Sequence, residues 1–353
     1  MSPRRRVLLG VAALVLAAGA AVPAIGWLRT GGHGGRPVAA PGSGPGSGPG
    51  SGPAGASSAG RPGPSGAGRA GAASRPAPTS APAPRPAATG TLHFVANTGP
   101  QVTAMSALGY NLFDTGADPQ TVHALPAGAR ALVWLGDLGD AGCGPPRLSF
   151  AEVTAAVDRL AGDPRVYGYF LADEPHPKAC PGAVADIRAR ADYIRAHDPS
   201  HRSFVVVLDG TNQCGGTYGC EFGALRPAES HVDLIGLDPY PCNTSNASTG
   251  CEYAKIDDTV RRAEAAGVPR TAMVPVFQAF GQQCAGSNYY RLPAPAEMRT
   301  MLAHWTAQVA HPAFDYTYGW ERQSSACPTL ADADGQHGYP DLQSVLAAHN
   351  QAP

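Results

Sequence analysis

Four carboxylate residues stand where apolar runs of the sequence end, and they are its strongest candidates for acid–base chemistry. Asp173 and Glu174 follow one apolar run, Asp238 ends a second, and Glu321 follows a third. A carboxyl group donates a proton near neutral pH when its surroundings are apolar or anionic, and an adjacent carboxylate is one such influence. Asp173 and Glu174 are therefore the candidate acid–base pair, and Asp238 and Glu321 are candidates for a further catalytic carboxylate.

Aromatic, amide and acidic side chains occupy similar places near other apolar runs. Ring faces can stack on a ligand, while carboxylates and amides can hydrogen-bond its polar groups. We predict that five such residues bind the substrate: Trp134, Asp137, Tyr240, Gln278 and Trp320.

The elements that must position these residues repeat one pattern eight times after residue 90. A short β-branched or aromatic run is followed by a polar loop and then by a stretch with helical periodicity. The predicted strands are 92–96, 111–115, 131–136, 166–172, 203–209, 233–238, 272–277 and 315–320. The predicted helices include 150–161, 183–196, 253–266, 294–309 and 339–349, and Ser149 with Glu152 forms a capping-box pattern before the first of them.

Eight such units in about 260 residues predict a (β/α)8 TIM barrel, with a doubly wound open sheet as the alternative. Near-continuous apolar strands such as 204–208 indicate burial on both faces, as in a parallel sheet. No glycine-rich phosphate loop follows the first strand, which weakens the open-sheet alternative. In a barrel the C-terminal strand ends form one rim, so the candidate residues are expected to meet there.

The first 90 residues differ in composition from the rest of the chain. Three Arg residues precede the uncharged stretch 7–27, which fits either a cleaved signal peptide or a retained membrane anchor. Residues 31–90 are almost entirely Gly, Pro, Ala, Ser and Thr, as in a disordered linker. We therefore expect a signal or anchor at 1–30, a linker at 31–90 and a barrel at 91–353.

Basic and acidic residues are also distributed unequally on the two sides of residue 90. Residues 1–90 hold nine Arg and no acidic residue, whereas the remainder holds 17 basic and 27 acidic residues. An acidic domain does not suit nucleic acid, whose phosphates need clustered Lys and Arg. The chain has only 2 Lys among its 26 basic residues and is rich in Ala and Gly, a composition typical of GC-rich bacterial genomes.

All eight cysteines lie after residue 90, and an even number in an exported chain predicts disulfides. Pairing within one loop or between the loops of adjacent strands gives four predicted bridges: Cys143–Cys180, Cys214–Cys220, Cys242–Cys251 and Cys284–Cys327. The sequence shows neither a Cys-x-x-Cys pair nor a cluster of thiolates and histidines, so we expect neither zinc nor another cofactor.

The segment Tyr167-Gly-Tyr-Phe-Leu-Ala-Asp-Glu-Pro175 resembles the Asn-Glu-Pro signature of clan A glycoside hydrolases. The resemblance extends over the predicted barrel and implies that Glu174 is the general acid/base and that Asp173 binds a sugar hydroxyl. The nucleophilic Glu of that clan follows strand 7, where this chain has Gln278 instead. An amide cannot form the covalent glycosyl intermediate of the retaining mechanism.

Three hypotheses for the rim remain open. Glu174 could act with Asp238 or Glu321 in a two-carboxylate mechanism. Alternatively, Asp173 could orient a 2-acetamido group of the substrate while Glu174 protonates the leaving group and Tyr240 holds the amide, as in the substrate-assisted hexosaminidases that the Asp-Glu pair resembles. In the third, the barrel only binds carbohydrate or cell wall. We expect a monomeric, extracellular or cell-surface glycoside hydrolase-like protein acting on polysaccharide, with an inactive carbohydrate-binding protein as the alternative.

Overall fold

The protein is represented by a computed structural model that describes residues 91–136, 146–178, 180, 182–208, 220–284, 289–323, 326–331 and 339–352. Its strands are β1 (Leu92–Val95), β2 (Leu112–Thr115), β3 (Arg130–Trp134), β4 (Val166–Asp173), β5 (Arg202–Val207), β6 (Leu234–Leu237), β7 (Met273–Gln278) and β8 (Phe314–Tyr318). Its α-helices are α1 (Val102–Ala107), α2 (Pro119–His123), α3 (Phe150–Leu160), α4 (Gly182–His197), α5 (Cys220–Leu225), α6 (Pro227–Ser230), α7 (Ala254–Ala265), α8 (Pro295–Gln308) and α9 (Pro340–Asn350). Two short 3-10 helices are η2 (Thr244–Asn246) and η3 (Arg270–Ala272).

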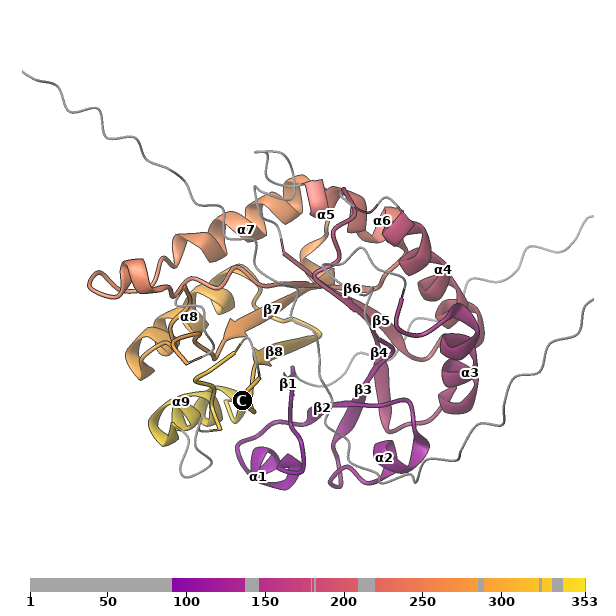
Figure 1. The fold of residues 1–353 in the computed structure, drawn as a ribbon, viewed down its shortest axis with the longest axis horizontal. Coiled ribbons are helices and arrows are strands. Elements are labelled where there is room, and N and C mark those ends of the chain that lie inside the picture. Colours follow the sequence, from indigo (N-terminus) through magenta and orange to yellow (C-terminus); the bar gives the residue numbers. More distant parts are fainter. Residues whose placement is uncertain are drawn as a thin grey trace, which may run out of the picture. The chain divides into compact units, whose positions relative to one another are not determined.

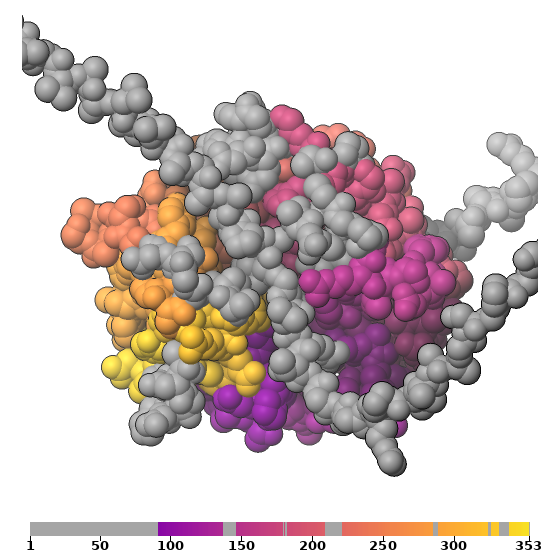
Figure 2. Space-filling view, viewed as in Figure 1, coloured from indigo at the N-terminus to yellow at the C-terminus, as the bar shows by residue number. Residues whose placement is uncertain are grey.

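The eight strands form a closed parallel barrel in sequence order, with β8 pairing with β1. Helices surround the strands, with α3, α4, α7, α8 and α9 on the outside (Figure 1). The space-filling view shows the coloured segments following one another around this face in sequence order (Figure 2). The prediction of a (β/α)8 barrel is therefore confirmed, and the open sheet is excluded.

Alternation along the strands divides the core into two clusters. Residues such as Phe94, Phe204 and Tyr316 belong to a cluster inside the barrel. Residues such as Val95 and Val205 belong to a second cluster, together with apolar residues of the helices. Both faces of the strands are buried, which explains their near-continuous apolar sequences. One strand contact depends on glycine, because a Cβ on Gly168 would lie 2.3 Å from the backbone oxygen of Arg202.

Local sequence signals account for the ends of several outer helices. Ser149 caps α3 by accepting from the backbone N–H of Glu152, whose carboxylate in turn accepts from the backbone N–H of Ser149. This capping box was predicted from the sequence and is confirmed. Proline at the first position of α8 and α9 has no N–H to leave unsatisfied there, so it suits the start of a helix.

The predicted helices at 150–161, 183–196, 253–266, 294–309 and 339–349 correspond to α3, α4, α7, α8 and α9. The predicted N-terminal segment and linker, residues 1–90, lie outside the described residues. Within the part of the chain that the structure describes, none of the helices has the length and apolar character needed to span a membrane.

Candidate active site

The predicted acid–base pair, Asp173 and Glu174, lies at the end of β4, and β5 separates this strand from β6, which leads to Asp238. Asp173 ends β4 and lies beside Val206 of β5, which in turn lies beside Gly236 of β6. Glu174 follows β4, and its backbone N–H donates to the carbonyl oxygen of Val206 at 3.1 Å. Asp238 comes directly after β6, at the same end of the barrel. The parallel register thus carries the three carboxyl groups to the C-terminal rim.

Glu174 and Asp238 are hydrogen-bonded to each other there. Both are buried, with 8% of Glu174 and 2% of Asp238 exposed. Burial raises the pKa of Asp238 well above its ordinary value, and the charge and hydrogen bond of Glu174, followed by the charge of Asp173, raise it further. We therefore assign the shared proton to Asp238, which donates it to the Glu174 carboxylate.

Asp238 Oδ2 is a buried carboxyl oxygen that accepts no hydrogen bond from an N–H or hydroxyl group of the described residues. Buried polar atoms in folded proteins are nearly always hydrogen-bonded, and an exception needs an explanation such as a bound molecule. The carboxyl group of Glu174 or a polar group of a bound molecule would satisfy this oxygen.

The backbone at this rim adopts left-handed conformations at residues other than glycine. Glu174 has φ of 44°, Tyr240 has φ of 37° and Asn97 has φ of 62°. These residues follow β4, β6 and β1. Such conformations cost about 1–3 kcal/mol each and cluster at sites where function fixes a side chain. The strain therefore falls on Glu174 itself and on its neighbours at the rim.

Four tyrosines surround the carboxyl groups: Tyr240, Tyr290, Tyr316 and Tyr318. Tyr240 packs edge-on against Tyr290, with ring centroids 5.6 Å apart. Burial raises the pKa values of all four hydroxyls, and the negative charges of Asp173, Glu174 and Asp238 add to the effect. The hydroxyls therefore stay protonated and can act as hydrogen-bond donors, and that of Tyr318 donates to Gln323 Oε1 at 3.1 Å.

Tyr290, Tyr316 and Tyr318 were not among the predicted site residues. Tyr316 and Tyr318 are two positions apart on β8, so both side chains point to the inside of the barrel. This spacing of two residues along a strand is the sequence signal that could have placed Tyr316 and Tyr318 at the site. Tyr290 comes from the loop before α8, and its position depends on tertiary contacts.

Asp114 is a further carboxyl group that the predicted site did not include. It lies near the end of β2 and accepts a hydrogen bond from the hydroxyl of Thr98 at 3.2 Å. Burial raises the pKa of Asp114 to about 6, although hydrogen bonds from Thr98 and from backbone groups oppose the rise. Its charge also raises the pKa of Tyr316, which connects it to the same rim.

Trp320 and Glu321, predicted to bind substrate and to act in catalysis, belong to a separate polar group. The indole N–H of Trp320 donates to Gln101 Oε1 at 3.0 Å, and Gln101 Nε2 donates to Glu321 Oε1 at 3.2 Å. Gly99 leaves room for this carboxylate, because a Cβ there would lie 2.4 Å from Glu321 Oε1. Glu321 therefore lies between the loops that follow β1 and β8, bonded to Gln101.

Trp134 and Asp137 were also predicted to bind substrate. Only Trp134 belongs to the described residues. Trp134 ends β3 and is partly buried, with its ring edge-on to Phe170 at a centroid distance of 4.7 Å. It packs against the cluster inside the barrel. Asp137 lies outside the described residues.

Gln278, at the end of β7, is buried and bonded to backbone groups. Its Oε1 accepts from the N–H of Cys242 at 2.8 Å, and its Nε2 donates to the carbonyl oxygens of Cys242 at 2.7 Å and Arg291 at 3.0 Å. The amide thus joins the loop after β6 to the loop before α8. These two loops carry Tyr240 and Tyr290, so Gln278 positions the walls of the site.

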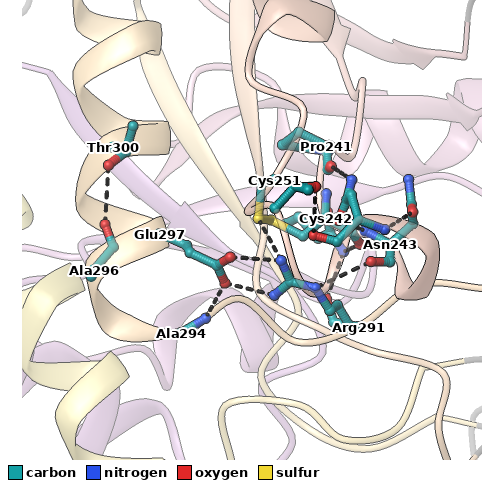
Figure 3. A network of polar contacts seen from close by, with 12 residues as sticks. Pro241, Cys242, Asn243, Cys251, Arg291, Ala294, Ala296, Glu297 and Thr300 are labelled. Atoms are coloured by element: carbon teal, nitrogen blue, oxygen red, sulfur yellow. Dashed lines mark hydrogen bonds and ion pairs between the residues drawn. A yellow bond between two sulfur atoms is a disulfide. The ribbon is translucent and has the colours of Figure 1, made fainter.

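Arg291 strengthens the same junction through its guanidinium group (Figure 3). It donates to both carboxylate oxygens of Glu297 at 2.6 Å and to the carbonyl oxygen of Asn243 at 3.1 Å. Its hydrogen bonds are the leading cause of the lowered pKa of Glu297. A paired, fork-like contact of this kind fixes direction as well as distance, so the two loops and the start of α8 are held together.

Disulfides fix the loops on this side of the barrel. The predicted bridges Cys242–Cys251 and Cys284–Cys327 are confirmed. Cys180 is disulfide-bonded, and its predicted partner Cys143 lies outside the described residues. The predicted pair Cys214–Cys220 remains a prediction, because Cys214 and the side chain of Cys220 also lie outside them.

No family model matches the sequence, and no curated protein matches it. Solved structures do match. A β-galactosidase from the psychrophilic Marinomonas ef1 has a TM-score of 0.53 at 10% identity, covering 73% of this chain and 59% of the other. A Faecalibacterium prausnitzii β-glucuronidase has a TM-score of 0.50 at 10% identity, covering 74% and 48%. An Amycolatopsis mediterranei endo-β-1,3-glucanase, in complex with laminaritriose, has a TM-score of 0.47 at 16% identity, covering 74% and 99%.

The present chain thus spans about half to three fifths of the length of the first two enzymes. At these identities the match concerns the fold. Together with the closed parallel barrel, it shows that the chain shares the (β/α)8 barrel fold with the matched parts of these enzymes.

Proposed function

We propose that the domain hydrolyses glycosidic bonds of an extracellular polysaccharide and that Glu174 is its general acid/base. The observation that carries this proposal is the hydrogen-bonded pair of Glu174 and Asp238 at the C-terminal rim of the barrel. A glycosidic oxygen leaves as an alcohol only if it receives a proton. A buried carboxyl group whose pKa is raised, hydrogen-bonded to a second carboxyl group, can supply it.

Disulfides support action outside the cell. Structural disulfides persist in oxidising compartments and are rare in the cytosol. Two pairs and the bonded Cys180 all lie in loops near the rim. The uncharged stretch 7–27 after three Arg residues agrees with export, and we propose that it directs the chain to the cell surface or beyond it.

The geometry of the carboxyl groups favours substrate assistance over the two-carboxylate mechanism. The two carboxyl groups of a retaining enzyme lie about 5–5.5 Å apart, and those of an inverting enzyme lie farther apart. Asp238 is hydrogen-bonded to Glu174. Hydrogen-bonded carboxyl groups lie closer together than the two carboxyl groups of either kind of enzyme. Glu321 is bonded to Gln101, and Gln278 is bonded to backbone groups. These contacts leave the attack on the anomeric carbon to a group of the substrate.

In the proposed reaction, the pair of Glu174 and Asp238 first donates its proton to the glycosidic oxygen through Glu174. The carbonyl oxygen of a 2-acetamido group attacks the anomeric carbon as the glycosidic bond breaks, forming a cyclic oxazolinium ion. Asp173 accepts a hydrogen bond from the acetamido N–H, and the Tyr240 hydroxyl donates one to its oxygen. Water then attacks the anomeric carbon, Glu174 takes a proton from it, and the ring opens.

Hydrolysis of chitin oligosaccharides and of laminarin, a glucan without acetamido groups, tests the proposal. Glu174→Gln should lower turnover about 10²–10⁴-fold, because the amide cannot donate the proton as an acid. Glu252→Gln is the matched control, since Glu252 is exposed in the loop after β6. Turnover of chitin oligosaccharides but not of laminarin would support substrate assistance. If Glu321→Gln lost as much turnover as Glu174→Gln, that result would instead favour a two-carboxylate mechanism.

The alternative function is carbohydrate binding without hydrolysis. It would appear as saturable binding of an oligosaccharide, measured by calorimetry, with no reducing ends released. That result would remove the catalytic role of Glu174.

A further inference from the structure

A second group of polar side chains lies at the other end of the barrel from Glu174. His93 is the second residue of β1, and Asp315 is the second residue of β8. The two residues are direct partners in the register that closes the barrel. Their strand neighbours Phe94 and Tyr316 belong to the cluster inside the barrel, so His93 and Asp315 face the outer helices. His349, near the end of α9, completes the group.

The three side chains point their nitrogen and oxygen atoms at one another. His93 Nδ1 lies 3.0 Å from both carboxylate oxygens of Asp315, and His349 Nε2 lies 2.8 Å from Asp315 Oδ2. One donor atom from each residue lies within 4.8 Å of the other two. The rings of His93 and His349 meet edge to face, and Phe277 packs against His349. The orientation of the imidazoles is therefore fixed by packing.

We propose that His93, Asp315 and His349 bind a divalent transition-metal ion, with Zn²⁺ as the best fit. Two imidazole nitrogens and one carboxylate oxygen form a donor set that Zn²⁺ accepts, leaving a fourth position for water. Donors about 2.0–2.2 Å from a tetrahedral ion lie about 3.3–3.6 Å from each other. Small rotations of the three side chains would admit the ion without a change in the strands.

Burial gives the ion a protected site. The side chain of Asp315 is 3% exposed and that of His93 is 10% exposed. The side chain of His349 is 23% exposed, so an ion would enter past this residue. A carboxylate shielded from water binds a cation more strongly than one at the surface.

The place of the site indicates what the ion would do. Its ligands come from β1, β8 and α9, the first strand, the last strand and the last helix of the barrel. An ion bound by all three would hold the two ends of the barrel sequence together. Because the site lies at the N-terminal strand ends, we assign it a stabilising role separate from hydrolysis.

No sequence motif indicates this site. His93 and Asp315 lie 222 positions apart, and His349 lies 34 positions beyond Asp315. Metal motifs are recognised by short, regular spacings of Cys and His, and only the closure of the barrel brings these three residues together.

Calorimetric titration of the EDTA-treated full-length protein with ZnCl₂ tests the proposal. One Zn²⁺ per chain is expected to bind, and Zn²⁺ at about 100 times the dissociation constant should raise the melting temperature by about 5–10 °C. Co²⁺ in the same titration should give a visible absorption band of a tetrahedral site. Mg²⁺ should have no effect, because it prefers oxygen ligands.

The variant His349→Ala should lose this Zn²⁺ binding and the rise in melting temperature. Its control is His304→Ala, since His304 is also partly exposed on an outer helix and pairs with Asp257 at 3.2 Å. Asp315→Asn should also lose binding, and His349→Ala remains informative if that variant does not fold. Wild-type protein that binds no Zn²⁺, or His349→Ala that binds it as wild type does, would overturn the proposal.

Discussion

The proton shared by Glu174 and Asp238 is the feature that most clearly sets these residues apart from other polar residues at strand ends. Both side chains are buried, and Asp173 adds a further negative charge. A carboxyl partner within hydrogen-bonding distance gives the proton a defined direction, toward Glu174. This directed proton is what the proposed reaction uses.

Replacing Asp238 with Asn should change the pH dependence of hydrolysis. The wild-type rate should fall as the pH rises through the raised pKa of Asp238, because the pair then loses its proton. In Asp238→Asn this position no longer titrates, so that alkaline fall should move or disappear, and turnover should be about 10–100-fold lower. The full pH–rate profiles of the two proteins provide the measurement. Superimposable profiles would rule out a role for Asp238 in the protonation step.

Asp114 predicts a pH dependence of stability. Its folded-state pKa of about 6 lies above the ordinary 3.8, so the fold favours the protonated form. This contribution is complete below pH 3.8 and is lost as the pH rises through about 6. Between these values the free energy of unfolding should fall by up to about 1.4 kcal/mol per pH unit from this group.

Asp114→Asn should flatten that part of the curve. Urea denaturation at a series of pH values measures it, with Asp341→Asn, an exposed residue at the start of α9, as the control. If the difference in unfolding free energy between Asp114→Asn and wild type were the same at every pH, Asp114 would not have the raised pKa.

Gln278→Glu should destabilise the domain rather than restore a nucleophile. Gln278 Nε2 donates to the carbonyl oxygens of Cys242 and Arg291, and a carboxylate would place negative charge against both. The expected cost is about 3–5 kcal/mol of unfolding free energy, typical of an unpaired buried charge. Gln120→Glu, at an exposed position of α2, should cost far less. Wild-type stability with increased hydrolysis would contradict the positioning role.

The sequence identified part of the candidate site at residue scale. Asp173, Glu174 and Asp238 could be recognised because each stands at a strand end, and parallel strand ends share one rim. The role of Gln278 could not be recognised, because its partners lie 36 and 13 positions away in loops without regular structure. The left-handed backbone of Glu174 likewise leaves no trace in the residue type.

At the scale of elements, strands were easier to predict than short helices. All eight strands coincide with apolar or aromatic runs, because both of their faces are buried. The long outer helices were predicted from their periodicity. The helices α1, α2, α5 and α6 contain four to six residues each, too few turns to show a periodic pattern.

Removing either of the two confirmed disulfides should lower stability by a different amount, because they close loops of different length. Cys242–Cys251 closes a segment with a sequence separation of 9, and Cys284–Cys327 closes one with a separation of 43. A longer closed loop restricts the unfolded chain more, so removing the pairs by Ser substitution should cost about 2.5 and about 4 kcal/mol respectively. Thermal and urea unfolding of the two double variants provides the comparison. A larger loss from the shorter loop would mean that native contacts dominate the effect.

For the whole molecule, the fold followed from counting strand–helix units, since eight units close into a barrel. The two ends of the barrel carry different groups of polar residues. Its C-terminal rim gathers the carboxyl groups, the tyrosines and the confirmed disulfides. Its N-terminal end holds the group of His93, Asp315 and His349 where the barrel closes. A change at either end can therefore be tested for its effect on hydrolysis and on stability separately.

The most direct test of the account is the rate of reducing-end release from chitin oligosaccharides by wild type, Glu174→Gln and Glu252→Gln. Wild type and Glu252→Gln should hydrolyse the substrate, and Glu174→Gln should lose about 10²–10⁴-fold in rate, while all three proteins keep the same melting temperature. Hydrolysis that is unchanged in Glu174→Gln would contradict the central claim that this carboxyl group donates the proton.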